Sequence, residues 1–371
     1  MTDDYYGQPH PDTVPVVFAP DVISVKGRLE HGISFTPDTK EMAFGVLHKD
    51  YSGHIQYAKK IANTWTAPSL FEPLASEMVF LPYFTPDGKN LLYAQGNSVT
   101  NDSYRTNLYA LEKVNGAWKK PTKLKAPIHS ESREANASMT LDGTIYFSSN
   151  RNCEGKENCF TADLFSSKQV DNEYQTVQEV TGLNSDNDEE SVFVSPNEEY
   201  LILCRYTDNT SFADLYISYR NKVGLWSTPR VLNASVNSKD WDRRPFVSFD
   251  NRFLFFTRLT ITGQDIIESD IYWVNTSKVF TPFVYNAPAD VSVKIGEPFK
   301  IAIPPDYFKD INDKALRIAI HQDAYHWLQF DDKKMILSGL PTQKGDFKVI
   351  FTATDASLNA TEHALIITVI E

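Results

Sequence analysis

The stretch "YFTPDGKNLLYAQ", residues 83–95, decides the fold of this chain. It contains two short apolar segments separated by Pro-Asp-Gly. Proline presets φ for a tight turn and glycine accepts a positive φ, so the stretch predicts two antiparallel strands joined by a turn. Similar turns recur at Asp38, Asp142, Asn197 and Asp250. The turns are 49 to 55 residues apart, and a steady period of this length indicates a repeat architecture.

Each repeat contains four expected strands. A long, variable loop follows the second strand and leads to a third, such as "NLYAL" (107–111). The fourth follows a turn with Trp and Pro, as in "WTAPSLF" (65–71) and "WKKPTKL" (118–124). In the third repeat this segment is the degenerate "YQTVQEV" (174–180). Four consecutive antiparallel strands describe one blade of a β-propeller, so we predict an all-β fold with a five-bladed propeller over residues 1–285.

The fifth repeat lacks a convincing fourth strand of its own. The N-terminal segment "DTVPVVFAPDVIS" (12–24) is similar to "WTAPSLFEPLASE" (65–77) of the first repeat. We therefore expect the N-terminal strand to complete the last blade, which removes an exposed sheet edge. The alternative is that "VFTPFVY" (279–285) supplies this strand.

The Pro-Asp-Gly-like turns and the third strands with Asp-Leu-Tyr or Asp-Ile-Tyr resemble PD40 repeats, the WD40-like repeats of TolB-type propellers. The resemblance covers residues 11 to about 280. This family usually has six blades, whereas this chain has five repeats. The resemblance implies an exported bacterial protein. It leaves the function open, because the family includes periplasmic scaffold proteins, peptidase-associated propellers and carbohydrate-active enzymes.

Residues 286–371 no longer follow the period. Alternating strands with a turn every ten or so residues predict a small β-sandwich. The order "WLQFD" (327–331) followed by "LSGLPTQKGDFKVIFTATD" (337–355) resembles the cadherin-like and putative-Ig modules of bacterial surface proteins. Some relatives bind calcium, and oxygen ligands of the right kind are present at Asp310, Asn312, Asp313 and Asp355. Solvated loop carboxylates are the alternative interpretation.

Composition excludes two classes of protein. The formal net charge of −12 disfavours nucleic-acid binding, which needs a basic surface. No apolar run reaches the ~18 residues that a membrane-spanning helix needs. The oligomeric state is not indicated.

Two features bear on the compartment. Cys153 and Cys159 flank "CEGKENC". Their spacing allows a local disulfide, which would indicate an oxidising environment, but two unpaired thiols fit equally well. The first residues, "MTDDYYGQPHPDT", contain no apolar signal segment. This fits either a cytosolic protein or an exported one without its signal peptide, and we expect a periplasmic or secreted protein.

The long loops share one end of the predicted propeller with the connections between blades. Binding residues accumulate on long loops of a rigid scaffold, so we expect the site there and a plain surface at the Pro-Asp-Gly end. Four inner strands begin at the loop end with a carboxylate, at Glu30, Glu134, Glu189 and Asp242. The expected ligand-binding residues around them are His31, Arg133, Arg151, Arg205, Tyr206, Trp241, Arg243, Arg244 and Arg258, with Glu190 nearby.

Two interpretations of this rim compete. The acids and arginines could pair between neighbouring blades and hold the ring in register. Alternatively, the arginines hold a carboxylate or sugar hydroxyls, and two of the four carboxylates act on a glycosidic bond. His31 could then be a base or a metal ligand. We expect a binding or scaffold protein that recognises a glycan or a protein on the long-loop face. The alternative is a carbohydrate-active enzyme, a glycosidase or lyase.

Overall fold

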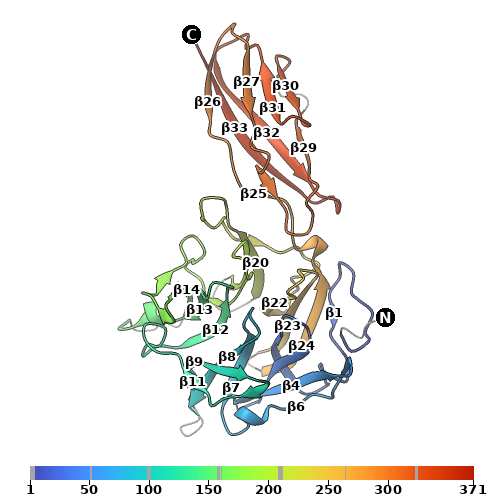
Figure 1. Cartoon of the computed structure of the whole chain (residues 1–371), viewed down its shortest axis with the longest axis vertical. Coiled ribbons are helices and arrows are strands. Elements are labelled where there is room, and N and C mark those ends of the chain that lie inside the picture. Colours follow the sequence, from blue (N-terminus) through green and yellow to red (C-terminus); the bar gives the residue numbers. More distant parts are fainter. Residues whose placement is uncertain are drawn as a thin grey trace. The chain divides into compact units, whose positions relative to one another are not determined.

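The computed structural model describes residues 5–50, 52–97, 102–156, 159, 161–207, 212–263, 265–321 and 325–371, without the side chains of 102–104. Short strands dominate, with three 3₁₀ turns at η1 (Glu72–Leu74), η2 (Arg151–Cys153) and η3 (Thr276–Lys278), so the fold is all-β as predicted (Figure 1). The chain forms two compact units. The first comprises Met1–Tyr219 and Trp226–Thr276, and the second comprises Arg220–Leu225 and Ser277–Glu371. Within the described ranges, no helix combines the length and hydropathy needed to span a membrane.

The first two repeats each pair four strands antiparallel in chain order. Repeat one contains β2 (Leu29–Phe35), β3 (Glu41–Leu47), β4 (Gly53–Ile61) and β6 (Ser69–Leu70), with β5 (Thr64–Trp65) closing a hairpin on β4. Repeat two contains β7 (Val79–Phe84), β8 (Asn90–Asn97), β9 (Asp102–Val114) and β11 (Thr122–Lys123), with β10 (Ala117–Trp118) closing a hairpin on β9.

The other three repeats follow the same pattern. Repeat three contains β12 (Glu134–Met139), β13 (Ile145–Ser149), β14 (Asp163–Ser167) and β17 (Gln178–Glu179), with a separate hairpin of β15 (Gln169–Val170) and β16 (Glu173–Tyr174). Repeat four contains β18 (Glu189–Val194), β19 (Tyr200–Tyr206), β20 (Ala213–Tyr219) and β21 (Arg230–Val231). Repeat five contains β22 (Trp241–Val247), β23 (Phe253–Thr262) and β24 (Asp265–Asn275).

The N-terminal strand completes repeat five. β1 (Val16–Val17) pairs antiparallel with β24, with Val16 opposite Trp273. The backbone N–H of Phe18 continues the ladder by donating to the carbonyl of Ile271 at 2.8 Å. The predicted closure is therefore confirmed. The competing segment instead contains β25 (Phe283–Val284), which pairs with β28 (Phe308–Lys309) of the second unit.

The turn between the first two strands of a repeat is held by its aspartate. In repeat two, the Thr85 hydroxyl donates to Asp87 Oδ1 at 2.6 Å, and the backbone N–H of Lys89 donates to the same oxygen at 3.0 Å. The following residue has a positive φ of 69°, which Gly88 adopts without a Cβ clash. Thr39 takes the corresponding place in repeat one with φ 54°, which shows that the hydrogen bonds, more than the glycine, define this turn.

Every inner strand has a β-bulge near its first residues. The register shifts occur between His31 and Ile33, Phe80 and Tyr83, Ala135 and Ser138, Glu189 and Ser191, and Arg243 and Phe246. Bulges re-aim side chains and often lie beside functional sites. All five inner strands contribute to one small central cavity of about 40 Å³, through Gly32, Leu81, Asn136, Ser191, Arg244 and their neighbours. The beginnings of the inner strands therefore lie around a common centre.

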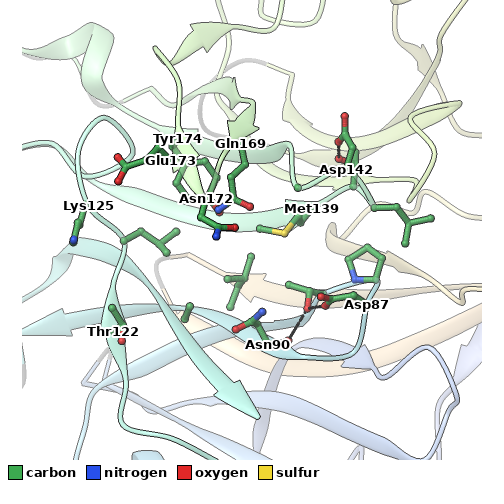
Figure 2. Close-up of a pocket in the computed structure, with 18 of the residues that line it drawn as sticks. Asp87, Asn90, Thr122, Lys125, Met139, Asp142, Gln169, Asn172, Glu173 and Tyr174 are labelled. Carbon is green, nitrogen blue, oxygen red and sulfur yellow. Dashed lines mark hydrogen bonds between the residues drawn. The ribbon is translucent and has the colours of Figure 1, made fainter. Parts of the chain in front are cut away.

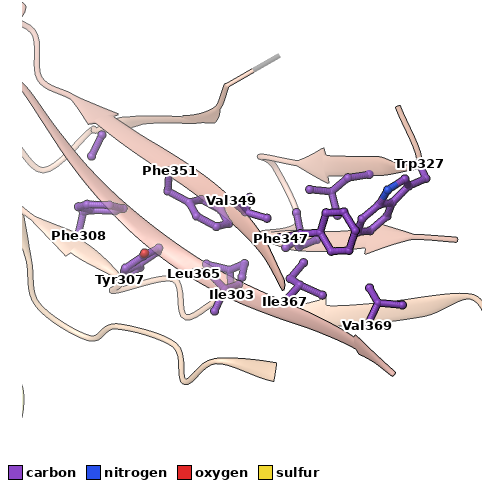
Figure 3. Close-up of a cluster of buried hydrophobic side chains, with 13 residues drawn as sticks. Ile303, Tyr307, Phe308, Trp327, Phe347, Val349, Phe351, Leu365, Ile367 and Val369 are labelled. Atoms are coloured by element: carbon purple, nitrogen blue, oxygen red, sulfur yellow. The ribbon is translucent and has the colours of Figure 1, made fainter. Parts of the chain in front are cut away.

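The second unit is a two-sheet sandwich. One sheet has the order β26 (Val291–Lys294), β33 (Ala360–Ile370), β32 (Gly345–Thr354) and β29 (Arg317–Ile320), and the other β27 (Phe299–Ala302), β31 (Ile336–Gly339) and β30 (Leu328–Asp331). Figure 3 shows the core, in which Phe347, Val349 and Phe351 of β32 lie beside Leu365 and Ile367 of β33. Burial alternates along β32, as the period-two pattern predicts for a sheet with one buried face.

Candidate functional site

The four rim carboxylates are all paired with arginine, and each pair lies within one repeat. Glu30 pairs with Arg28 at 2.6 Å, Glu134 with Arg151 at 3.4 Å, Glu189 with Arg205 at 2.6 Å and Asp242 with Arg258 at 2.7 Å. The side chains of the four acids are fully buried. The interpretation in which acids and arginines pair between neighbouring repeats therefore does not hold for these four acids, although it does hold for Glu190. Each guanidinium reaches its acid from its own repeat or from the segment just before it.

The arginines of these pairs also bind the backbone of the segment that connects two repeats. Arg205 Nη2 donates to the carbonyl of Leu183 at 2.6 Å, and Arg258 Nη2 donates to that of Val236 at 2.7 Å. Serines complete the arrangement, since Ser185 Oγ donates to Glu189 Oε1 at 2.5 Å. A motif that recurs with the same partners in several repeats is what a structural role requires. A catalytic pair, in contrast, has to be asymmetric.

Burial changes the acidity of these groups despite the arginines. Desolvation raises the pKa of Glu30 and that of Glu134 to about 7, against the lowering effect of Arg28 and Arg151. Desolvation also raises the pKa of Glu189 and Asp242, against the lowering effect of Arg205 and Arg258.

A different constellation, which we call the arginine cluster, surrounds Glu190 and consists of Glu190, Arg133, Arg243, Arg244 and His31. Arg244 Nη2 donates to Glu190 Oε1 at 2.6 Å and Arg243 Nη2 to Oε2, while Arg133 Nη2 lies 3.8 Å from Oε1. Burial alone would raise the pKa of Glu190, but the three guanidiniums hold it well below its usual range. The cluster joins repeats three, four, five and one.

His31 is a neutral member of the cluster. Arg244 Nε donates to His31 Nε2 at 3.1 Å, so the proton of the neutral ring lies on Nδ1. Burial and the charges of Arg244 and Arg243 hold the pKa of His31 well below its usual range. His31 Nδ1 is buried and has no hydrogen-bond partner among the described residues. A ring in this state is a hydrogen-bond donor, so its role as a base or metal ligand has no support in this geometry.

The cluster has more positive charge and more donors than its own acid satisfies. Three guanidiniums face the ionised Glu190, and Asp188 is near enough for Arg133 and Arg243 to lower its pKa. The buried atoms without a hydrogen-bond partner in the described chain include Arg133 Nε, Arg243 Nε, Arg244 Nη1 and His31 Nδ1, and all four are N–H donors. Buried polar groups are normally satisfied, so four such donors within one cluster could serve an acceptor from outside the chain. An anion supplies both the acceptors and the missing charge.

The two aromatic residues predicted to bind ligand, Tyr206 and Trp241, pack beside this cluster. Tyr206 donates from its hydroxyl to Glu190 Oε2 at 2.9 Å and packs edge-on against Trp241 at 5.2 Å between ring centroids. The Arg243 guanidinium lies 5.8 Å from the Tyr206 ring and 5.7 Å from the Trp241 ring. Tyr206 is buried and therefore belongs to the cluster as a structural contact. The tips of three long loops, residues 98–101, 208–211 and 264, lie outside the described residues.

Asp188 is a neighbour of the cluster that the sequence did not single out. Its Oδ1 accepts the backbone N–H of Ala162 at 2.9 Å. Burial and the nearby Glu190 raise the pKa of Asp188 to about 6. The two carboxyl groups therefore differ in acidity, with Glu190 ionised and Asp188 close to its titration range at neutral pH. Their spacing in "DNDEE" (186–190) was the available signal, but four acidic residues within five positions do not reveal which one faces inward.

The predicted calcium ligands act as turn caps. Asp310 Oδ1 accepts the backbone N–H groups of Asn312 at 2.8 Å and Asp313 at 3.0 Å, and Asp313 and Asp355 cap their own loops similarly. Among these four residues, as far as the structure describes them, Asp310 Oδ2 is the one buried oxygen without a hydrogen-bond partner, whereas calcium takes six to eight oxygens. Over the described ranges, no three His, Cys, Asp or Glu side chains come together as metal ligands. Calcium binding at these residues therefore stays a prediction.

The Pro-Asp-Gly end is not plain, contrary to our expectation. A groove of about 430 Å³ lies between repeats two and three at this end. Figure 2 shows Gln169, Asn172 and Met139 on one side of it and Asn90 and Thr122 on the other. Elsewhere, Cys153 and Cys159 form a disulfide, which decides between the two interpretations of these cysteines, and Cys204 is a buried free thiol.

Comparison with family models finds a match over the second unit only. The Putative Ig domain family matches residues 281–370, in agreement with the predicted Ig-like module. No curated protein matches the chain.

Similar solved structures include a thermostable family-43 glycoside hydrolase, with 11% identity, TM-score 0.47, and coverage of 67% of this chain and 89% of that one. The catalytic domain of a Coprinopsis cinerea GH62 alpha-L-arabinofuranosidase has 9% identity, TM-score 0.44, and coverage of 71% and 97%. A putative alpha-galactosidase from Bacteroides fragilis has 24% identity and TM-score 0.20, and the match spans 24% of this chain and 18% of that protein. These TM-scores are too low to support an argument about activity.

Proposed function

We propose that this chain is an exported binding protein, in which a five-bladed propeller (residues 1–285) recognises an anionic group of a glycan or protein at the arginine cluster. Residues 286–371 form the accompanying Ig/cadherin-like sandwich. The observation that carries the proposal is the set of four buried donors, from His31, Arg133, Arg243 and Arg244, that have no hydrogen-bond partner among the described residues. They converge on the end of the inner strands where the long loops also lie.

The geometry favours binding over catalysis by the rim carboxylates. Glu30, Glu134, Glu189 and Asp242 are buried and locked to arginines, so none is free to reach a substrate. The arginine cluster, in contrast, is asymmetric and occurs once. Guanidiniums bind carboxylate, sulfate and phosphate oxygens through paired N–H groups, which gives both affinity and orientation.

The disulfide supports an extracytoplasmic location. Disulfides persist in oxidising compartments and are rare in the cytosol. The Cys153–Cys159 bridge lies in the loop between the second and third strands of repeat three, where it restrains a segment of the proposed binding face. A periplasmic or secreted protein fits this chemistry.

A carbohydrate-active enzyme is the second candidate, because of Asp188 and Glu190. Enzymes that cleave glycosidic bonds use one protonated and one ionised carboxyl group. The pKa of Asp188 is raised to about 6 while that of Glu190 is held low, which separates the two states as such a reaction requires. The triple arginine contact weakens Glu190 as a nucleophile, and therefore we rank this candidate second.

A glycan array combined with thermal shift tests both candidates. Acidic oligosaccharides should raise the melting temperature, and mass analysis of each hit should show it unchanged if the protein only binds. Arg133→Gln should weaken binding because Arg133 is the most exposed guanidinium of the cluster. Arg252→Gln is the control, since it removes the same charge from an exposed ion pair with Asp250, a residue of the Pro-Asp-Gly-type turn of repeat five. Cleaved products that disappear in Asp188→Asn would establish the enzyme instead, and no response to any acidic glycan or peptide would refute the proposed site.

A further inference from the structure

The repeats make it possible to compare two equivalent interfaces inside one molecule. Between repeats one and two, Lys113 forms an ion pair with Glu41. Lys113 Nζ also lies 5.0 Å from the centre of the Trp118 ring, and this ring packs on Phe71 at 5.5 Å and on Phe84 at 6.3 Å. This interface is filled by side chains.

The next interface has different residues at every one of these positions. Strand register makes Gln169 and Tyr174 the counterparts of Lys113 and Trp118, because each pair is opposed across the same hairpin. Leu124 is the counterpart of Phe71, since their N–H groups donate to the third strand in the same way. Asn90 replaces Glu41 and Met139 replaces Phe84 by their positions beside the turn. The set that replaces the filled interface is Asn90, Leu124, Met139, Gln169 and Tyr174.

All five replacements line the groove of about 430 Å³ between repeats two and three. A Phe-to-Leu, a Phe-to-Met and a Trp-to-Tyr difference remove side-chain volume, while Asn and Gln remove the ion pair that crosses the filled interface. Trp65 of repeat one and Trp226 of repeat four keep the aromatic packing, against Phe35 at 6.1 Å and Tyr146 at 6.3 Å. The groove is therefore a local departure from the repeat and not a general property of it.

The groove is lined by polar side chains that make no hydrogen bonds within the described part of the chain. The side chains of Asn90, Gln169, Asn172 and Tyr174 line it, and none of the four has a hydrogen bond to another residue in the described part of the chain. Gln169 lies across the turn of repeat three, where a Cβ on Gly143 would come within 2.9 Å of its amide oxygen. Gly143, with φ 85°, thus allows this amide to reach the groove.

We propose that this groove binds an uncharged oligosaccharide. Amide and hydroxyl groups are suited to the alternating donors and acceptors of sugar hydroxyls, and the Tyr174 ring offers an aromatic face for a pyranose. Charges in the lining nearly balance, with Asp87, Asp142 and Glu173 against Lys123 and Lys125, so an anion gains nothing there. The volume lies in the range of small-molecule sites and accommodates more than one sugar ring. This site is separate from the arginine cluster.

The test rebuilds the filled interface. The triple variant Asn90→Glu, Gln169→Lys, Tyr174→Trp restores three of the five residues of the neighbouring interface, including its ion pair and its Trp ring, and should fill most of the groove. We expect calorimetric titration of the intact protein to detect binding of neutral trisaccharides such as maltotriose, cellotriose or mannotriose. The triple variant should lose about tenfold or more of this affinity. Its melting temperature should not fall, which separates loss of the site from loss of the fold.

A gentler variant keeps the test decisive if the triple variant folds poorly. Asn172→Gly removes one free amide at a position with φ 63°, where glycine causes no strain. It should weaken the same trisaccharide severalfold, whereas Arg133→Gln should leave this binding unchanged. Failure of all neutral trisaccharides to bind, or equal binding by the wild-type protein and both groove variants, would overturn the proposal. Loss of trisaccharide binding in Arg133→Gln would assign it to the arginine cluster and also overturn it.

Discussion

Arg244 and His31 are 213 positions apart in the sequence, yet Arg244 Nε donates to His31 Nε2 at 3.1 Å. This contact joins repeat five to repeat one and fixes the ring tautomer. It also leaves His31 Nδ1–H as a buried donor without a partner in the described chain. A histidine beside two arginines cannot easily accept a second proton, so the contact defines a neutral donor at the centre of the cluster.

His31 should therefore not titrate in the physiological range. Burial, Arg244 and Arg243 lower its pKa, and the opposite effect of Glu190 is smaller. We expect imidazole ¹⁵N NMR to show the Nδ1–H tautomer without a change from pH 8 to pH 5. A His31 resonance that shifts with a midpoint near 6.5 would contradict this assignment.

Glu190→Gln should destabilise the fold and strengthen anion binding. The substitution leaves Arg133, Arg243 and Arg244 without their shared counter-charge, and removing one partner of a buried ion pair costs about 3–5 kcal/mol. Sulfate should then raise the melting temperature of the variant more than that of the wild type, at ionic strength matched with chloride. Glu112→Gln removes the same charge from the exposed face of β9 and should show neither effect. Equal sulfate responses would show that the cluster does not bind anions.

Arg205→Ala should destabilise the protein because it leaves the buried Glu189 unpaired. The cost should be about 3–5 kcal/mol of unfolding free energy, measured by denaturant titration. The double variant Arg205→Ala, Glu189→Gln should recover part of this loss, since the buried charge is then absent. Additive losses would mean that the two side chains do not interact. A similar cycle at Arg258 and Asp242 should give the same pattern if the motif is structural.

Glu134→Gln should change how stability depends on pH. The folded pKa of Glu134 is raised by burial from 4.5 to about 7, so the native state binds more protons than the unfolded state between these values. This group therefore contributes stability at low pH that is lost as the pH rises through this window. The variant should therefore be more stable relative to the wild type at pH 8 than at pH 5. In other words, its free energy of unfolding minus that of the wild type should be more positive at pH 8. An offset that does not vary with pH would contradict the raised pKa.

Local chemistry made most of the first unit predictable. Turns such as Thr85–Asp87 are built from residues a few positions apart, and the period of the turns gives the order of the strands. The closure by Val16 and Val17 was predictable because the segment repeats the pattern of 65–77. Pairing of Glu134 with Arg151 was less accessible, because both pairing within a repeat and pairing between repeats fit the same sequence positions.

The arginine cluster and the groove depend on contacts between different repeats, and the sequence pattern within one repeat does not reveal these contacts. Glu189 and Glu190 are adjacent, and the bulge in β18 decides that only Glu190 meets Arg243 and Arg244. The degenerate segment with Tyr174 was visible in the sequence. Its consequence became clear only when the neighbouring repeat placed Asn90 opposite it.

The pairing of β1 with β24 also means that the two partner strands are synthesised at widely separated times. Val16 leaves the ribosome 257 positions ahead of its partner Trp273. At translation rates of about 5–20 residues per second, that interval is on the order of ten to fifty seconds. During this interval β1 has no strand to pair with. Once β24 has emerged, its outer edge stays unpaired until the N-terminal segment pairs with it. A nascent chain that ends before β24 (Asp265–Asn275) therefore leaves the N-terminal strand without its pairing partner.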